Sequence, residues 1–213
     1  MKASEDSKGY EWSDADLNES HSYLLPKLYA TLELVQKEYE EIDTLFDLGC
    51  GNGSVANALS QHGWRVTGVD SSELGIKQAN EAYPALKLFR ASAYDDLFSR
   101  FGRYPVVISL EVVEHVYYPK KYADTLFSLV EPGGFAIVST PFHGYWKNLA
   151  LALSGTMDRH FTALWEHGHI KFWSEFTLAT LLNSSGFADI RFERVGRIAP
   201  LAKSMIAICR KPK

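Results

Sequence analysis

The fold is decided by residues 44–54, which read TLFDLGCGNGS. A short apolar run that leads into Gly49, Gly51 and Gly53 is typical of a β-strand, a tight turn and a helix. Glycines at alternate positions let the backbone bend sharply and approach a ligand closely. Asp70 lies 21 residues beyond Gly49, at the end of the next predicted strand, where its carboxylate can accept both hydroxyls of a ribose. Together the glycines and the acid predict a nucleoside site rather than an ordinary glycine-rich turn.

Predicted strands and helices alternate outward from this stretch. Strands are expected at 44–48, 65–69, 86–90, 105–110, 135–139, 190–195 and 204–209, and helices at 17–36, 55–62, 73–83, 95–101, 120–129 and 175–184. Such alternation indicates a parallel sheet covered on both faces. The last two strands have a short connection and should form a hairpin. We therefore predict a doubly wound α/β fold with a seven-stranded, mostly parallel sheet and one antiparallel strand near its edge.

Composition narrows the class of protein. The chain has 213 residues, 46% of them hydrophobic and 23% charged, and a net charge of −4. These values are ordinary for one globular domain and argue against a nucleic-acid partner, which usually requires a basic surface. Cys50 and Cys209 are too few for a disulfide scaffold, and the polar N-terminus has no apolar core of a secretory signal. No apolar run reaches the roughly 20 residues of a membrane span. We expect a cytoplasmic monomer or homodimer.

A dinucleotide site is the main rival interpretation. Gly51, Gly53 and Ala56 fit the G-x-G-x-x-A pattern of NAD(P)-binding proteins. Tyr117 and Lys121 have the spacing of a dehydrogenase pair, but the proline between them disfavours the helix that would bring them together. An acid at position 47, at the end of the first strand, suits the ammonium of a methionine group and would repel a pyrophosphate.

Four motifs carry a resemblance to a known family. The stretches DLGCGNG (47–53), GVD (68–70), ASAYDD (91–96) and EVVEHV (111–116) resemble the class I, Rossmann-like S-adenosylmethionine-dependent methyltransferases. Within that superfamily they are most similar to the O-methyltransferases of ubiquinone biosynthesis, over about residues 44–186. The resemblance implies S-adenosyl-L-methionine as cofactor. The cofactor-binding residues that it implies, with Tyr23 and His21 covering the cofactor, are Asp47, Gly49, Cys50, Gly51, Asn52, Asp70, Ser71, Ser92, Ala93, Tyr94, Leu110, Glu111 and Tyr23.

The methyl acceptor should lie beyond the fourth strand, where the chain reads EVVEH from Glu111. If a helical turn begins at Glu111, then Glu111, Glu114 and His115 share one face. Two carboxylates and an imidazole could bind Mg²⁺ or another divalent metal ion, which would lower the pKa of a phenol. The alternative is a metal-free site in which the glutamate only caps backbone groups. His115 is a candidate general base in both cases.

Residues 141–173 form a long segment rich in aromatic and histidine side chains. A segment of this length in a compact domain is typically functional, and its aromatic side chains suit a flat, apolar acceptor. Packing is the competing explanation for any single aromatic residue. We rank His143 and His169 above His160 and His167 as further catalytic candidates.

These expectations define one domain, 1–213, in four segments: an N-terminal region with a cap helix (1–40), the cofactor core (41–140), a substrate lid (141–173), and the last helix with a C-terminal hairpin (174–213). The predicted reaction is O-methylation of a small phenolic or quinol-like acceptor. Methylation of RNA at the 2′-oxygen is an alternative, although Val116 stands where such enzymes have a further histidine. N- or C-methylation of another small molecule stays open, and an NAD(P)-dependent oxidoreductase is the remaining alternative.

Overall fold

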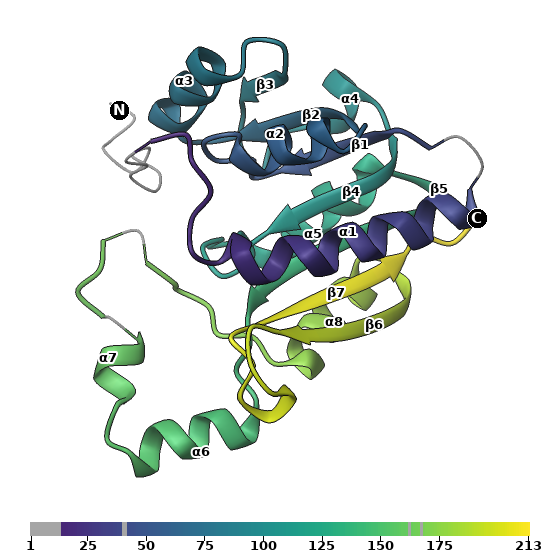
Figure 1. The fold of residues 1–213 in the computed structure, drawn as a ribbon. Coiled ribbons are helices and arrows are strands. Elements are labelled where there is room, and N and C mark those ends of the chain that lie inside the picture. Colours follow the sequence, from purple (N-terminus) through teal and green to yellow (C-terminus); the bar gives the residue numbers. More distant parts are fainter. Residues whose placement is uncertain (1–13, 40–41, 162, 167) are drawn as a thin grey trace, which may run out of the picture.

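The structure is a computed structural model that describes residues 14–39, 42–161, 163–166 and 168–213 (Figure 1). Its centre is a seven-stranded sheet in the order β3-β2-β1-β4-β5-β7-β6. The strands are β1 Thr44–Leu48, β2 Arg65–Asp70, β3 Lys87–Arg90, β4 Tyr104–Leu110, β5 Val130–Pro141, β6 Ala188–Val195 and β7 Ser204–Arg210. The helices are α1 His21–Glu38, α2 Ser54–Gln61, α3 Glu73–Ala82, α4 Leu97–Phe101, α5 Pro119–Leu129, α6 Tyr145–Leu153, α7 Met157–Phe161 and α8 Glu175–Ser184, and η1 Ala199–Leu201 is a short 3₁₀ turn.

The strand directions confirm the predicted topology. Strands β1 to β5 pair in parallel, whereas β7 runs antiparallel to both β5 and β6. β7 is thus the antiparallel strand near the edge, and β6 and β7 form the expected C-terminal hairpin. The strand order reverses between β1 and β4. Ligands of doubly wound sheets bind beyond the carboxyl ends of the strands at this switch point.

Side chains of the central strands alternate between two hydrophobic cores, one on each face of the sheet. Leu45 packs with helices α1, α2 and α3, whereas its neighbour Phe46 packs with α4, α5 and α8. In β4, Val106 and Ile108 enter the first core and Val107 enters the second. This period of two matches the pleat of a strand. Helices therefore cover both faces of the sheet. The edge formed by the carboxyl ends of the strands is left open.

Helix α1 covers the sheet and is not mainly a cap. Leu24, Leu28 and Leu32 are at most 1% exposed and belong to the first core, and Figure 1 shows the helix lying along the sheet. The helix begins at His21 rather than at residue 17, because the Asn18 side-chain oxygen accepts the backbone N–H groups at the start of the first turn, at 3.0 and 3.3 Å. Only this first turn reaches the open edge of the sheet.

Strand β5 is longer than predicted. It starts at Val130, which pairs with Tyr104 across a register shift, and runs through Gly133 and Gly134. A Cβ atom at Gly134 would lie 2.6 Å from the Pro105 carbonyl oxygen, so only glycine fits where the two strands approach. Gly133 and Gly134, which lie between the helix expected at 120–129 and the strand expected at 135–139, thus belong to the sheet.

The segment after β5 contains two helices that were not predicted, α6 and α7. Figure 1 shows both at the carboxyl-end side of the sheet, away from α1 and α2. None of the helices in the described part of the chain is long and apolar enough to cross a membrane.

Candidate active site

The glycine loop between β1 and α2 has a conformation that requires glycine. Gly49, Gly51 and Gly53 have φ values of 93°, 52° and 76°, a region that side-chain-bearing residues rarely adopt. A Cβ atom at Gly49 would also lie 2.4 Å from a methyl group of Val112. The loop is held against β2, since the amides of Gly49 and Cys50 both donate to the Val69 carbonyl oxygen. The backbone of the loop therefore lies open to the cavity beside it.

Asp70, at the end of β2, borders this loop. Its Oδ2 accepts the Gly51 amide at 3.0 Å and its Oδ1 accepts the Ser72 amide at 2.7 Å. A carboxylate has about four lone-pair positions, so both oxygens can still accept hydroxyl groups from a ligand. The two amides therefore fix the orientation of the carboxylate.

Asp47 is a buried acid with an unused acceptor. Its side chain is 2% exposed, and its Oδ2 has no hydrogen-bond partner among the residues that the structure describes. Burial, with a smaller contribution from the Asp70 carboxylate, raises the pKa of Asp47 to about 8. A buried polar atom without a partner is costly. A ligand ammonium group beside Asp47 would supply the missing partner, which fits the methionine end of the expected cofactor.

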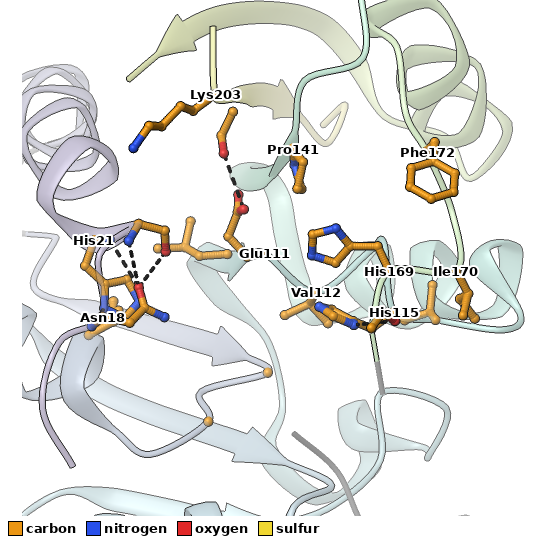
Figure 2. A pocket seen from close by; sticks show the side chains of 18 of the residues that line it. Asn18, His21, Glu111, Val112, His115, Pro141, His169, Ile170, Phe172 and Lys203 are labelled. Atoms are coloured by element: carbon orange, nitrogen blue, oxygen red, sulfur yellow. Dashed lines mark hydrogen bonds between the residues drawn. The ribbon is translucent and has the colours of Figure 1, made fainter. Parts of the chain in front are cut away.

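One cavity of about 1690 Å³ runs along the carboxyl ends of the strands. All the residues predicted to bind cofactor line it, namely Asp47, Gly49, Cys50, Gly51, Asn52, Asp70, Ser71, Ser92, Ala93, Tyr94, Leu110, Glu111 and Tyr23. Figure 2 shows Asn18 and His21 on one side of the cavity and His115, His169 and Phe172 on the other. The motifs that are dispersed in the sequence therefore meet in one place.

The segment just before α1 is held against the glycine loop and Tyr83 by contacts that the motif analysis missed. The Asn52 side chain donates to the carbonyl oxygens of Asp14 and Asp16, at 2.9 and 3.0 Å. The Tyr83 hydroxyl donates to the carbonyl oxygen of Ala15 at 2.6 Å. Because all three contacts use backbone acceptors, the residue types at 14–16 carry no signal. The sequence signals these contacts only through Asn52, because a polar side chain within a glycine turn suggests a hydrogen-bonding role.

Glu111 does not begin a helical turn, which corrects the expected geometry of the 111–115 motif. Its φ is 54°, so the chain turns sharply after β4 and the side chain leaves the face that Glu114 and His115 share. The Glu111 carboxylate instead accepts the hydroxyls of Ser139 at 2.8 Å and Ser204 at 3.3 Å. Burial raises the pKa of Glu111 to about 7. This glutamate therefore faces β5 and β7.

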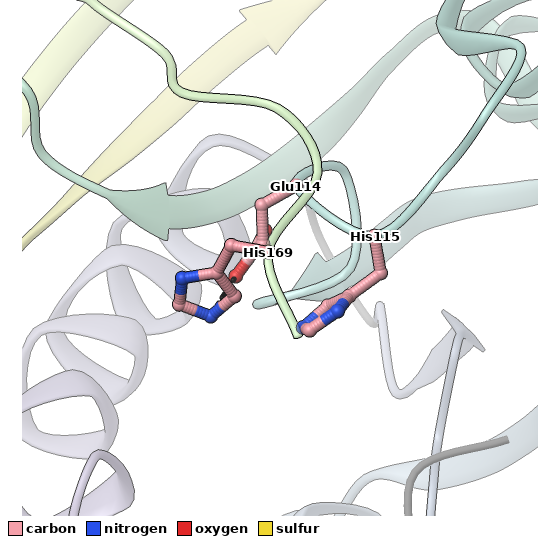
Figure 3. Close-up of side chains that lie close together, drawn as sticks. All are labelled: Glu114, His115 and His169. Carbon is pink, nitrogen blue, oxygen red and sulfur yellow. Dashed lines mark ion pairs between the residues drawn. The ribbon is translucent and has the colours of Figure 1, made fainter. Parts of the chain in front are cut away.

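Glu114 and His115 meet a third residue, His169, rather than Glu111 (Figure 3). One ligand atom from each of the three lies within 4.8 Å of the others. Glu114 is 1% exposed; its Oε2 accepts the Thr140 hydroxyl at 3.0 Å, and its Oε1 lies 4.0 Å from His169 Nε2. Burial, reinforced by Glu111, raises the pKa of Glu114 well above its usual value.

The backbone explains why His169 joins this group. The amides of Ile170 and Lys171 donate to the Glu114 carbonyl oxygen at 2.9 and 3.0 Å, and His115 Nδ1 lies 3.2 Å from the Gly168 carbonyl oxygen. The extended stretch that carries His169 is thus fastened to the turn after β4. Burial lowers the pKa of His169 to about 4, so its imidazole is neutral at physiological pH, as a metal ligand must be.

His143 lines the same cavity but belongs to a different group. It is 8% exposed and packs against Phe161, Phe172 and His160, with ring centroids 5.8, 5.1 and 5.3 Å away. Burial is the main reason that its pKa falls to about 4. The three histidines ranked as catalytic candidates, His115, His143 and His169, therefore all face the cavity. His167 lies outside the described residues.

Comparisons with known proteins identify the family of this chain. Residues 17–191 match a family described as a methyltransferase domain. The ubiquinone biosynthesis O-methyltransferase of Caulobacter sp. (strain K31) is 38% identical over 115 residues, which cover 52% of this chain and 45% of that protein. The protein of the same name from Rickettsia canadensis (strain McKiel) is 33% identical over 133 residues, covering 60% of this chain and 56% of that one. The matches thus span only about half of these relatives' length.

Solved structures share the fold. A Synechocystis magnesium protoporphyrin IX methyltransferase with bound S-adenosylhomocysteine superposes with a TM-score of 0.65 at 20% identity, covering 88% of this chain and 82% of that one. The methyltransferase domain of bacterial CtHen1-C gives a TM-score of 0.67 at 21% identity, covering 89% and 97%. Because the family match covers most of the chain and the cavity holds the expected glycine loop and acids, this chain belongs to the methyltransferase domain family, within the class I S-adenosylmethionine-dependent superfamily.

Proposed function

We propose that this chain transfers the methyl group of S-adenosylmethionine to a hydroxyl oxygen of a small aromatic acceptor, a phenol or a quinol. The observation that carries the proposal is the continuity of one cavity, of about 1690 Å³, from the glycine loop to a wall of histidine and aromatic side chains. Pockets for a single small ligand usually have about 300–1,000 Å³. This cavity has room for a cofactor and an acceptor side by side.

Asp70 and Asp47 would hold the two ends of the cofactor. The Asp70 oxygens would accept the ribose hydroxyls, and the unpaired Oδ2 of Asp47 would accept the ammonium group. The cofactor supplies an electrophilic methyl group on a sulfonium. The protein's part is to present an acceptor oxygen in line with that methyl, about 3 Å away, in a site without water.

The acceptor would lie against the aromatic part of the cavity. Tyr117, Trp165, Ile170 and Phe172 line this part, and their flat, apolar surfaces suit a ring better than a sugar or a peptide. The segment 141–173 would act as the predicted lid, since α6 and its connections form one wall. The ubiquinone-type relatives, whose names describe an O-methyltransferase, support the oxygen as the methylated atom.

Removal of the acceptor proton is the chemical problem that the histidines would address. His143 and His169 have pKa values of about 4 and are neutral at pH 7. A neutral imidazole has one ring nitrogen that can accept a proton. Transfer of a proton from a phenol of pKa about 10 to such a group costs about 8 kcal/mol, at roughly 1.4 kcal/mol per pKa unit. A histidine alone is therefore a weak base here, and the phenol itself must become more acidic.

A divalent metal ion held by Glu114, His115 and His169 would meet this requirement. The fit rests on the buried Glu114 Oε1, which has no hydrogen-bond partner within the described residues, and on two imidazoles beside it. One carboxylate and two histidines favour a transition metal over Mg²⁺. Such an ion would lower the pKa of a bound phenol. Glu111 takes no part in this set, in contrast to the sequence-based expectation.

The proposal is tested by methyl transfer to matched acceptors. Release of S-adenosylhomocysteine is measured with a catechol, with the corresponding aromatic diamine and with RNA, in the presence of Mn²⁺, Zn²⁺ or EDTA. Turnover of the catechol that EDTA suppresses supports the proposal. Turnover of only the diamine or the RNA would contradict it. A cytoplasmic location and a monomeric or homodimeric state stay predictions.

A further inference from the structure

Lys147 occupies an unusual position. It lies on α6, whose other residues are almost all apolar or aromatic (YWKNLALAL), and it is the buried residue of that helix. Its side chain lines the cavity, where Nζ donates to the Lys203 carbonyl oxygen at 3.3 Å. An ammonium group has three N–H donors. Within the described residues Nζ makes this one hydrogen bond, so two donors are left for another partner.

Three further basic side chains gather around Lys147. Arg197, His143 and His160 also line the cavity; the rings of His143 and His160 lie 5.3 Å apart, and Arg197 and Lys147 both act electrostatically on His160. With Lys147 we call these residues the basic cluster. Lys147 and Arg197 carry the positive charge of this cluster, and each cationic form disfavours the others. After burial itself, Arg197 is the main cause that lowers the pKa of Lys147, to about 8, and both Lys147 and Arg197 lower the pKa of His160.

The described residues leave this positive charge uncompensated. Neither Lys147 nor Arg197 forms an ion pair with them, whereas the neighbouring Lys203 is paired with Glu19 at 2.9 Å. The Glu111 carboxylate has a favourable but small influence on Lys147, and its oxygens are already held by serine hydroxyls. Lys147 is 9% exposed, and burial of an unpaired cation is costly, whereas Arg197 lies at the exposed rim of the cavity. A general excess of basic residues does not explain the cluster, because the chain has a net charge of −4.

We propose that Lys147 and Arg197 form an anion-binding subsite in the acceptor part of the cavity, and that the acceptor is a hydroxylated aromatic carboxylate. The carboxylate would lie between the Lys147 ammonium and the Arg197 guanidinium, and its ring would extend towards the aromatic wall. The subsite determines specificity, because it fixes which end of the acceptor ring faces away from the methyl group. The proposal rests on the proposed function, since it names the acceptor of the same site.

The methionine carboxylate of the cofactor is the competing occupant of this subsite. The two occupants differ in what the loss of Lys147 would weaken. An acceptor subsite changes the binding of aromatic acids and leaves the cofactor affinity intact, whereas a cofactor subsite does the reverse.

The experiment is a calorimetric titration of the full chain, saturated with S-adenosylhomocysteine, with 4-hydroxybenzoate and with 4-hydroxybenzyl alcohol. These ligands share the phenol and differ in the charge of the other end. The wild type should bind the acid at least about tenfold more tightly, as a charge-assisted contact requires. Lys147→Met should remove this preference, and Lys147→Arg should keep most of it.

The control is Arg159→Gln, on α7. Arg159 is exposed and lies outside the cavity, so this variant removes one positive charge from the same segment and should keep the preference. Equal affinity for the two ligands, no saturable binding of either, or a preference that survives in Lys147→Met would overturn the subsite. Weaker S-adenosylhomocysteine binding in Lys147→Met with an unchanged preference for the acid would assign Lys147 to the cofactor and also overturn it.

Methyl transfer is measured separately on the same protein. Tight and selective binding of 4-hydroxybenzoate without methylation of any hydroxyl would refute the proposed function and still support the anion subsite. The two proposals can therefore fail independently.

Discussion

Replacement of Asp47 by asparagine should stabilise the empty protein and weaken cofactor binding. Burial raises the pKa of this carboxyl from its usual 3.8 to about 8. In the unfolded chain the group ionises above about pH 4, whereas in the folded protein it keeps its proton up to about pH 8. The folded state therefore binds the additional proton in this window, and the free energy of unfolding falls by about 1.4 kcal/mol per pH unit.

The size of this loss of stability follows from the pH range between the pKa values of Asp47 in the unfolded and the folded protein. From about pH 4 to pH 7 there are about three units, which correspond to about 4 kcal/mol. Asp47→Asn cannot ionise and escapes this penalty, so its melting temperature without ligand at pH 7 should rise by at least about 8 °C, at about 2 °C or more per kcal/mol for a domain of this size. Below pH 4 the two proteins should be equally stable.

Cofactor binding should respond in the opposite direction. An ammonium group beside Asp47 requires the ionised carboxylate, so binding should release about one proton and tighten up to about tenfold per pH unit below pH 8. Asp47→Asn should bind S-adenosylhomocysteine about tenfold or more weakly, because a charged hydrogen bond is lost.

The assays are thermal melts between pH 4 and pH 8 and calorimetry in two buffers of different ionisation enthalpy. Asp43→Asn is the matched control, since Asp43 precedes the same strand at its opposite end and forms an exposed pair with Arg65. It should change the stability by less than about 0.5 kcal/mol. A lower melting temperature for Asp47→Asn together with unchanged S-adenosylhomocysteine affinity would refute the reasoning.

Three other substitutions, one of them with Glu111→Gln as its control, test separate parts of the site. Gly49→Ala should abolish S-adenosylhomocysteine binding and lower the melting temperature, because its φ of 93° and the contact of 2.4 Å with Val112 leave no room for a methyl group; normal binding would contradict the loop geometry. Glu114→Gln should reduce Zn²⁺ or Mn²⁺ affinity at least about tenfold in calorimetry, whereas Glu111→Gln should change it little; equal losses would return Glu111 to the metal site. Asn52→Ala loses two hydrogen bonds to the N-terminal segment and should speed S-adenosylhomocysteine release about tenfold in stopped-flow fluorescence; an unchanged rate would show that this segment does not retain the cofactor.

The fold could be predicted because its signals are local. Apolar strands that end in glycine or in an acid, as at Gly49 and Asp70, identify the switch point without any tertiary information. The limits of β5 could not be predicted, since Pro132 and Gly133 normally end an element. In this protein the strand continues through them, because the backbone of Lys211, just after β7, accepts the Gly133 amide and donates to the Gly134 carbonyl oxygen.

The acceptor site was less predictable because it depends on tertiary contacts. A left-handed φ at Glu111, a residue with a side chain, leaves no mark in the sequence, and it separates this glutamate from the metal candidates. His169 replaces it through the backbone bonds that join residues 170 and 171 to Glu114. The sequence marks Lys147 as unusual, because it is the single cation of an apolar helix. It does not show that Arg197, from a loop distant in the sequence, is its neighbour.

A crystal structure with S-adenosylhomocysteine is the most direct test of how this cavity works. We predict ribose hydroxyls on the two oxygens of Asp70, the ammonium group on Asp47, and the sulfur pointing towards His115 and His169. A cofactor product bound elsewhere, or with its sulfur turned away from the histidines, would contradict this prediction.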